Sequence, residues 1–408
     1  MNSAELSLRH LSLAVAAVAF VACGGESATG IADTAGTADT GLRFAAVSAG
    51  GYFACALATD RAAYCWGDNF GGQLGIGTDE IRRIPAAVGG SLRFTAVTTG
   101  IRHTCALTTT GTAYCWGEND AGELGVEGTG EWGRPSPLAV SGLHIFAAIS
   151  AGAAHTCAIT AAGAAYCWGD NSYGQLGDGS TTSSSAPVSV AGGHAFAAIS
   201  AGAGYTCAVT TAGAAYCWGA NFRGELGIGA ATTPSECSSG PCKLAPTAVV
   251  GGLAFSSISA SAGHSCGIAT DGATYCWGAN GGGQLGDGTT TDRTSPVRLT
   301  GGAAFVTVQT GSDGLGDGHT CALTAAGAAY CWGRNAVGQL GDGTTTDRVT
   351  PVRVSGGLAF AAISAGMDLT CGRTTRDLVY CWGSNSNGAL GSGSTERASP
   401  VPVRVGQS

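Results

Sequence analysis

Fourteen of the 17 cysteines in this 408-residue chain fall into seven pairs, and the two members of each pair stand ten residues apart. The pairs are Cys55 with Cys65, Cys105 with Cys115, Cys157 with Cys167, Cys207 with Cys217, Cys266 with Cys276, Cys321 with Cys331, and Cys371 with Cys381. Thiols in a regular pattern can form disulfides, bind a metal or remain as buried free thiols. Zinc sites use close Cys-x-x-Cys spacings and four ligands, and the sequence has neither. Disulfides and buried free thiols are therefore the two remaining interpretations.

Each pair brackets the sequence pattern of a β-hairpin: a β-compatible run, a Gly or Asp near the turn, and then Tyr or another β-former. When such a turn is centred five residues after the first cysteine, the two cysteines are directly opposed. Opposed residues at a non-hydrogen-bonded position have Cα atoms roughly 4.5–5.5 Å apart, close to the disulfide distance. We therefore predict one cross-strand disulfide per hairpin. Cys237 and Cys242 form an eighth predicted pair, which leaves Cys23 over.

The hairpins belong to a longer repeat with a period of about 50 residues, in the range of solenoids and propellers. Its marker is the tryptophan of a Tyr-Cys-Trp-Gly motif, found at Trp66, Trp116, Trp168, Trp218, Trp277, Trp332 and Trp382. One unit, residues 146–190, contains four short β-compatible stretches separated by Gly-rich turns, which is about one propeller blade. The 70 glycines, without a Gly-X-Y period, fit the many tight turns of such a fold.

The N-terminus has the layout of an export signal. Residues 11–22 form an apolar run too short to span a bilayer comfortably, preceded by Arg9. The run ends in Phe-Val-Ala-Cys-Gly-Gly at 20–25, which resembles a bacterial lipobox with Phe where Leu is usual. We expect a signal peptide over 1–23 with lipidation at Cys23, and a Gly/Ala/Thr-rich flexible tether over 24–41. The alternatives are a plain signal peptide with an incidental Cys23, and an unprocessed anchor or a frayed cytosolic terminus. The first two interpretations place the protein outside the cytoplasm, as a bacterial envelope lipoprotein or a secreted protein, where disulfides are favoured over free thiols.

The string Trp-Gly-x-Asn-x-x-Gly-Gln-Leu-Gly, followed by Pro-Val and Ser-Ala-Gly-x-x-His-Thr, resembles the repeat of the regulator-of-chromosome-condensation family. The resemblance covers all seven repeats, from residue 42 onwards. It implies an all-β, seven-bladed β-propeller of four-stranded blades over 42–408, with one intra-blade disulfide per repeat. Cytosolic members have Val or Ala, and Thr or Ser, at the cysteine positions, so the cysteines fit an oxidising compartment. The nuclear member exchanges nucleotide on a small GTPase and binds chromatin, and an exported acidic protein would meet neither partner.

Composition and motifs exclude several functions. The formal net charge is −8 and the 19 basic residues are scattered along the chain, whereas nucleic-acid binding normally needs a basic stripe. The sequence has no Gly-x-Ser-x-Gly, His-Glu-x-x-His or P-loop motif. We therefore predict a protein that is not an enzyme and uses no cofactor or metal, with contact to a membrane only through its N-terminal lipid. A hydrolase or lyase would need a polar site at the central channel.

Three patterns of polar residues could be read as metal sites. His103, His155, His264 and His319 recur two residues before the first cysteine of a pair, where a hydrogen-bonding role in the framework is favoured over a metal site. The insertion at 312–318 brings Asp313 and Asp317 close together in sequence, and whether it binds calcium stays open, because the terminal Glu of an EF-hand loop is missing. Asp178, Asp287 and Asp342 in Gly-Asp-Gly segments are expected to form turns.

The residues that follow the framework Asn differ between repeats and should share one face of the ring. We predict a binding surface there, because large aromatic side chains on loops are typical interface anchors. Its predicted members are Phe70, Trp132, Tyr173, Phe222 and Arg223. Acidic residues in the second repeat favour a basic protein partner at the cell envelope; they are Glu118, Asp120, Glu123, Glu127 and Glu131. The alternative ligand is a glycan or cell-wall fragment stacked on the same aromatic rings.

Overall fold

The computed structural model describes residues 41–126, 133–229, 236–312 and 316–406. These residues belong to one compact unit, Ala35–Ser408. The predicted signal peptide with Cys23, residues 24–40 of the tether, Trp132 and Asp313 lie outside the described residues.

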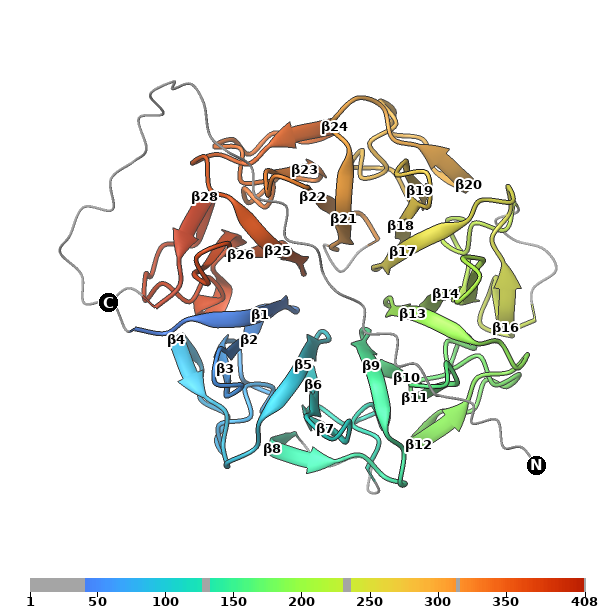
Figure 1. The fold of residues 1–408 in the computed structure, drawn as a ribbon, viewed down its shortest axis with the longest axis horizontal. Coiled ribbons are helices and arrows are strands. Elements are labelled where there is room, and N and C mark those ends of the chain that lie inside the picture. The colour runs from blue at the N-terminus through green and yellow to red at the C-terminus, as the bar shows by residue number, and fades with distance from the viewer. Residues whose placement is uncertain (1–40, 127–132, 230–235, 313–315, 407–408) are drawn as a thin grey trace, which may run out of the picture. The chain divides into compact units, whose positions relative to one another are not determined.

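Within the described residues, 28 strands form seven four-stranded sheets, and the sheets are arranged as blades around a central axis (Figure 1). Four consecutive strands make each blade, and neighbours in a blade pair antiparallel. The predicted all-β, seven-bladed propeller with four-stranded blades is confirmed.

The strands occupy four equivalent positions in the blades, from the axis outwards (Figure 1). The innermost strands are β1 (Phe44–Ala49), β5 (Phe94–Thr99), β9 (Phe146–Ala151), β13 (Phe196–Ala201), β17 (Phe255–Ala260), β21 (Phe305–Thr310) and β25 (Phe360–Ala365). The second strands are β2 (Phe53–Ala58), β6 (His103–Thr108), β10 (His155–Thr160), β14 (Tyr205–Thr210), β18 (His264–Ala269), β22 (His319–Thr324) and β26 (Leu369–Thr374). The third strands are β3 (Ala63–Gly67), β7 (Ala113–Gly117), β11 (Ala165–Gly169), β15 (Ala215–Ala220), β19 (Thr274–Gly278), β23 (Ala329–Gly333) and β27 (Val379–Ser384). The outer strands are β4 (Arg82–Ala87), β8 (Arg134–Ala139), β12 (Ser184–Ser189), β16 (Cys242–Ala248), β20 (Arg293–Arg298), β24 (Arg348–Arg353) and β28 (Ala398–Arg404), and a 3-10 turn, η1 (Ser386–Gly388), precedes β28.

The paired cysteines join the second and third strands of every blade. The two cysteines of each pair are directly opposed in the ladder, as Cys157 and Cys167 are between β10 and β11. The bonded pairs are Cys55 with Cys65, Cys105 with Cys115, Cys157 with Cys167, Cys207 with Cys217, Cys266 with Cys276, Cys321 with Cys331, and Cys371 with Cys381. In every one the Cα atoms lie 4.1 Å apart, slightly closer than the ladder spacing predicts.

All 14 of these cysteines are fully buried. The predicted disulfide in each repeat is therefore confirmed, and the alternative of buried free thiols is not. The eighth predicted pair, Cys237 with Cys242, is also bonded and holds the insertion before β16.

The hydrophobic core lies between blades. At the first interface, Cys55, Cys65 and Leu74 of one blade pack against Phe94 and Trp116 of the next. The ring closes by the same kind of packing, because Trp66 of the first blade lies in one cluster with Leu369, Val379 and Leu390 of the last. No strand is shared between the first and last blades of the described chain. Residues 42–406 therefore contain every blade and interface of the ring.

The described residues include no helix long and apolar enough to cross a membrane.

Candidate functional site

The ring has two faces, which we define by the connections they carry. The loop face carries the turns between first and second strands and the long loops between third and fourth strands. The hairpin face carries the hairpins between second and third strands and the connections to the next blade. In the first blade, the amide of Asp68 after β3 donates to the carbonyl of Tyr52 before β2 (2.9 Å), which ties the two loop-face segments together. All described positions that follow a framework Asn lie on the loop face.

The framework Asn organises each long loop from inside. Asn171 Oδ1 accepts the amide of Leu176 (3.0 Å), while its Nδ2 donates to the carbonyls of Ser180 and Thr182 (both 3.1 Å). Asn69, Asn280, Asn335 and Asn385 make the equivalent bonds. A side chain that satisfies three backbone groups fixes the loop without regular secondary structure. The variable residues therefore project from a rigid base.

A second contact joins each long loop to the next blade. The carbonyl of Gln73 accepts the indole Nε1–H of Trp116 (2.9 Å) and the hydroxyl of Thr104 (2.8 Å). Gly75 packs on the same indole, where an added Cβ would lie 2.6 Å from Nε1, and its φ of +68° also favours glycine. The Gly-Gln-Leu-Gly and Cys-Trp motifs are thus two halves of one contact between blades.

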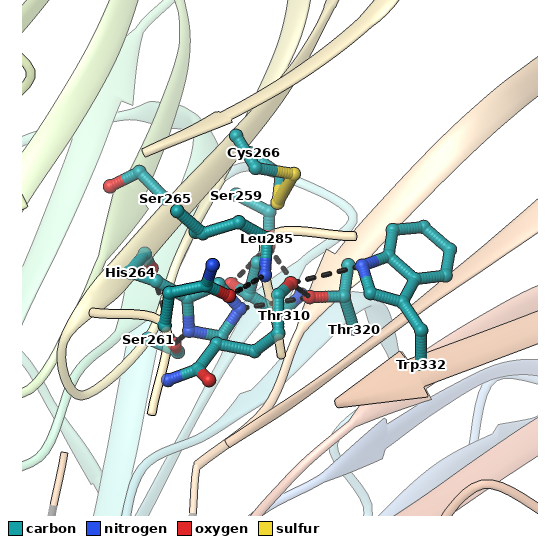
Figure 2. Close-up of a disulfide and its surroundings, with 12 residues drawn as sticks. Ser259, Ser261, His264, Ser265, Cys266, Leu285, Thr310, Thr320 and Trp332 are labelled. Carbon is teal, nitrogen blue, oxygen red and sulfur yellow. Dashed lines mark hydrogen bonds between the residues drawn. A yellow bond between two sulfur atoms is a disulfide. The ribbon is translucent and has the colours of Figure 1, made fainter. Parts of the chain in front are cut away.

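The recurring histidines belong to this contact. The hydroxyl of Thr156 donates its one proton to the carbonyl of Glu123 (2.9 Å), so it accepts from His103 Nε2 (3.0 Å). Figure 2 shows the equivalent bond between His264 and Thr320 (2.9 Å), next to a buried disulfide. Burial lowers the pKa of His103 to about 3, with a smaller contribution from His155, so the ring stays neutral. The hydrogen-bonding role predicted for these histidines is confirmed.

Three of the five predicted binding residues, Tyr173, Phe222 and Arg223, lie where the third, fourth and fifth blades adjoin on the loop face. The rings of Tyr173 and Phe222 contact edge to face, with centroids 5.4 Å apart and planes at 84°. Phe222 also packs on Gly240, where an added Cβ would lie 2.7 Å from the ring. Arg223 Nη1 lies 3.6 Å from Asp292 Oδ2 of the next blade. We call Tyr173, Phe222 and Arg223 the aromatic cluster.

Phe70 occupies the equivalent loop of the first blade, apart from the aromatic cluster, and is 72% exposed. Tyr52, on the neighbouring turn of the same blade, is 37% exposed and was not among the predicted residues. Its signal in the sequence is an aromatic side chain at a turn position where other repeats have Arg102, Ala154 or Gly204.

One of the acidic residues predicted to face a partner does not reach solvent. Glu123 is only 2% exposed, because it occupies the position of the framework Gln73, and its Oε2 accepts the amide of Ala121 (2.9 Å). Burial raises its pKa to about 7, and the neighbouring charges of Glu118 and Asp120 raise it further. The expectation that Glu123 contributes to an acidic surface is therefore wrong, whereas Asp120 is exposed. Glu127 and Glu131 lie outside the described residues.

The mouth of the central channel on the loop face is a cavity of about 100 Å³. The turns of all seven blades line it with Gly, Ala, Ser and Thr, together with Ile101 and Met367. No titratable side chain is among its described lining residues. Adjacent turns approach closely here: Met367 N donates to Gly50 O (2.8 Å) across the closing interface.

The described residues include no cluster of three or more His, Cys, Asp or Glu side chains that could hold a metal. Asp287 Oδ1 accepts the amide of Thr289 (2.9 Å), as Asp342 does for Thr344 and Asp178 for Ser180, which confirms the turn role of these aspartates. Calcium binding at Asp313 and Asp317 stays a question for experiment, because Asp313 lies outside the described residues.

Stretches of this chain are similar in sequence to known proteins. The human E3 ubiquitin-protein ligase HERC2 is 36% identical over 134 residues, which cover 30% of this chain and 3% of that protein. Human Protein RCC2 is 42% identical over 88 residues, 22% of this chain and 16% of that protein. The chain thus matches only a small part of the length of these relatives.

Two solved structures share the fold at low identity. Human WBSCR16 is 21% identical with a TM-score of 0.74, over 84% of this chain and 94% of that one. Yeast RCC1 (Prp20), solved with bound Kap60, is 19% identical with a TM-score of 0.73, over 94% of this chain and 91% of that one. The model of the RCC1-like domain matches residues 23–313 and 134–408, and the chain therefore belongs to the RCC1-like domain family.

Proposed function

We propose that this protein is an exported, lipid-anchored binding platform that captures a protein partner through its loop face. The observation that carries the proposal is the aromatic cluster, in which two side chains from different blades meet on loops that are fixed from inside. Relatives support the class of function. One solved structure of yeast Prp20p is reported with its binding properties to Gsp1p and histones, and another contains bound Kap60. Those partners are not transferred to this chain.

The aromatic cluster has the properties of an interface anchor. Phe222 is 48% exposed although it packs on both Tyr173 and Gly240, so its ring is positioned before a partner arrives. A side chain that is already held loses less rotamer entropy on binding than a free one. Arg223 and Asp292 form a polar rim beside it, and aromatic residues and arginine dominate binding hot spots.

The basic character proposed for the partner rests on charge. Asp120 is exposed on the second blade, next to the third blade that carries Tyr173, whereas Glu118 is half-buried and lies 3.5 Å from Arg102. Complementary charge mainly increases the association rate and excludes partners of the wrong sign. A partner with apolar anchors and basic flanks fits this combination better than a glycan, which is the ligand to test if no protein binds.

Export and lipidation are supported by two independent features. Every blade contains a buried disulfide, and such bonds persist in oxidising compartments. Cys23 follows the apolar segment at a lipobox-like motif and is the one cysteine outside the eight pairs. Palmitate labelling of the expressed protein that is lost in Cys23→Ala would support the anchor, and labelling retained in that variant would contradict it.

Affinity capture from envelope extract tests the platform. The bait is residues 42–408, and its loop-face variant carries Tyr173→Ala and Phe222→Ala. Leu143→Ala with Ile145→Ala is the matched control, because these exposed apolar side chains lie on the hairpin face. We expect a protein that the native and control baits recover and the loop-face variant loses. Equal recovery by all three baits would contradict the proposed face, and recovery of no protein would move the test to a glycan array.

A further inference from the structure

Charge is divided unequally between the two faces of the ring. Among the described residues, the hairpin face carries eight arginines, which are Arg43, Arg61, Arg93, Arg298, Arg353, Arg373, Arg376 and Arg404. It carries three described acidic residues, Asp60, Asp271 and Asp377, and all the other described acidic residues lie on the loop face. A protein with a formal net charge of −8 therefore has one basic face.

The basic residues of the hairpin face lie together, although they are far apart in sequence. In the fifth, sixth and seventh blades, the last residue of the outer strand is an arginine opposite the framework tyrosine: Tyr275 faces Arg298, Tyr330 faces Arg353, and Tyr380 faces Arg404. In the other four blades this position holds Ala87, Ala139, Ser189 or Ala248. The remaining arginines of this face are on the seventh blade, the first blade and its connection to the second. All eight thus occupy one arc of adjacent blades, from the fifth to the first, which we call the arginine arc.

Much of this charge is not neutralised within the propeller. Asp377 pairs with Arg373 (2.6 Å) and Asp60 lies 4.0 Å from Arg93. Arg298, Arg353 and Arg376 are exposed. In the part of the chain that the structure describes, none of these three has a carboxylate within ion-pair distance.

The chain also enters the propeller at this face. The first strand β1 runs from the hairpin face to the loop face, so Leu42 and Arg43 lie beside the hairpins. The amide of Phe44 donates to the carbonyl of Asp377 (2.8 Å) in the hairpin of the seventh blade, within the arginine arc. An N-terminal tether of residues 24–41 would therefore leave the propeller next to its exposed arginines.

We propose that the arginine arc is a docking surface for an anionic phospholipid membrane. The hairpin face lies against the headgroups, and the loop face with its aromatic cluster points away. The orientation rests on the lipid anchor proposed above, whereas the charge complementarity holds without it. A basic patch beside a lipid anchor is a common combination of membrane-binding signals. Each basic residue near an anionic surface adds roughly fivefold to the partition coefficient, and the arc supplies several.

Vesicle co-sedimentation of residues 42–408, which contain the complete ring and no lipid, tests this surface. The vesicles are phosphatidylcholine alone, or phosphatidylcholine and phosphatidylglycerol in equal parts. We expect binding only to the mixed vesicles, with release at high salt because surface charges are screened. The variant Arg298→Gln, Arg353→Gln and Arg376→Gln should lower the partition coefficient on the order of 100-fold.

The matched control removes the same charge from the other face, with Arg82→Gln, Arg102→Gln and Arg397→Gln. It should bind as the native protein does. Equal losses in both variants would overturn the proposal, because only net charge would then matter. Absence of vesicle binding would also overturn it, and concentration-dependent self-association in ultracentrifugation would then assign the arc to the acidic loop face of a second copy. The variant Tyr173→Ala with Phe222→Ala should bind vesicles normally, so failure of the protein-binding platform is distinguishable from failure of the membrane surface.

Discussion

Replacing Glu123 by Gln should stabilise the propeller at neutral and alkaline pH and have little effect in acid. The side chain is 2% exposed between the second and third blades, and its carboxylate has the backbone amide of Ala121 as a hydrogen-bond donor. In the first blade, Gln73 at the equivalent position also donates from Nε2 to Asp68 Oδ2 (2.9 Å). Glu118 stands at the position of Asp68, so an amide at residue 123 would have the same kind of acceptor.

The direction follows from proton binding. The folded protein binds the Glu123 proton more tightly than the unfolded chain does, because burial raises the pKa from 4.5 to about 7. The stabilisation from binding this proton is fully present below the pKa of the unfolded chain, and it is lost as the pH rises through the pKa of the folded protein. A pKa difference of this size corresponds to a loss of at most about 3 kcal/mol in the free energy of unfolding above neutral pH. We expect Glu123→Gln to raise the free energy of unfolding by about 1–3 kcal/mol at about pH 8, and to leave it nearly unchanged at about pH 4.

Guanidinium unfolding of residues 42–408 with intact disulfides, followed across this pH range, measures the difference. Glu80→Gln is the matched control, because it removes the same charge from a side chain that is 66% exposed and should change stability little at any pH. The reasoning is refuted if Glu123→Gln is destabilising at about pH 8, or if its effect is the same at both ends of the range.

Three further outcomes follow from the contacts between blades and from the disulfides. Thr156→Val removes the hydroxyl between His103 Nε2 and the Glu123 carbonyl, so it should lower the free energy of unfolding by about 2–4 kcal/mol. Chemical denaturation measures the change, and Thr182→Val at an exposed position is the control. Gly75→Ala should lower the thermal midpoint markedly, because the new Cβ would lie 2.6 Å from the Trp116 indole. Gly77→Ala is the control, because Gly77 also has a positive φ but its new Cβ would meet nothing within 4 Å. Equal effects of the two substitutions would show that the positive φ alone is responsible. Mild reductant without denaturant should reduce the disulfide between Cys237 and Cys242 first, because Cys237 is half-buried while the 14 cysteines of the blades are fully buried. Thiol alkylation with peptide mapping measures the order of reduction. Early labelling of a blade cysteine would contradict the prediction.

Local patterns predicted most of the fold, because the blade is a local structure. The ten-residue spacing of cysteines such as Cys157 and Cys167 set the hairpin register and the disulfide together, and both are as expected. The contact of Tyr173 with Phe222 was beyond such reasoning, since the two loops meet only when adjacent blades pack. Glu123 was misread as a surface residue for a related reason: it is buried at the contact with the next blade, where its carbonyl accepts from Thr156 and Trp168.

The arginine arc, too, could not be predicted from local sequence patterns, because it depends on how several blades are arranged. Arg298, Arg353 and Arg404 look scattered in sequence, and they gather on one side only because three neighbouring blades carry arginine at the same ladder position. The strand direction that places them on the hairpin face is likewise a property of the assembled blade. A sequence can reveal such a surface when residues are compared by their position within the repeat.

The ring closes without a shared strand, through the same packing and hydrogen bonds that join other neighbouring blades, so the starting point of the chain is arbitrary. Trp66 donates to the carbonyl of Ala389 (3.0 Å) across the last interface, as Trp116 does to that of Gln73 across the first. Both ends of the described propeller, near Leu42 and Gly406, lie on the hairpin face. A circular permutant that joins these ends through a short linker and opens the chain between two other blades, at Gly193 for example, would keep every blade intact. The fold thus depends on the cyclic order of the blades and not on which blade comes first in the chain.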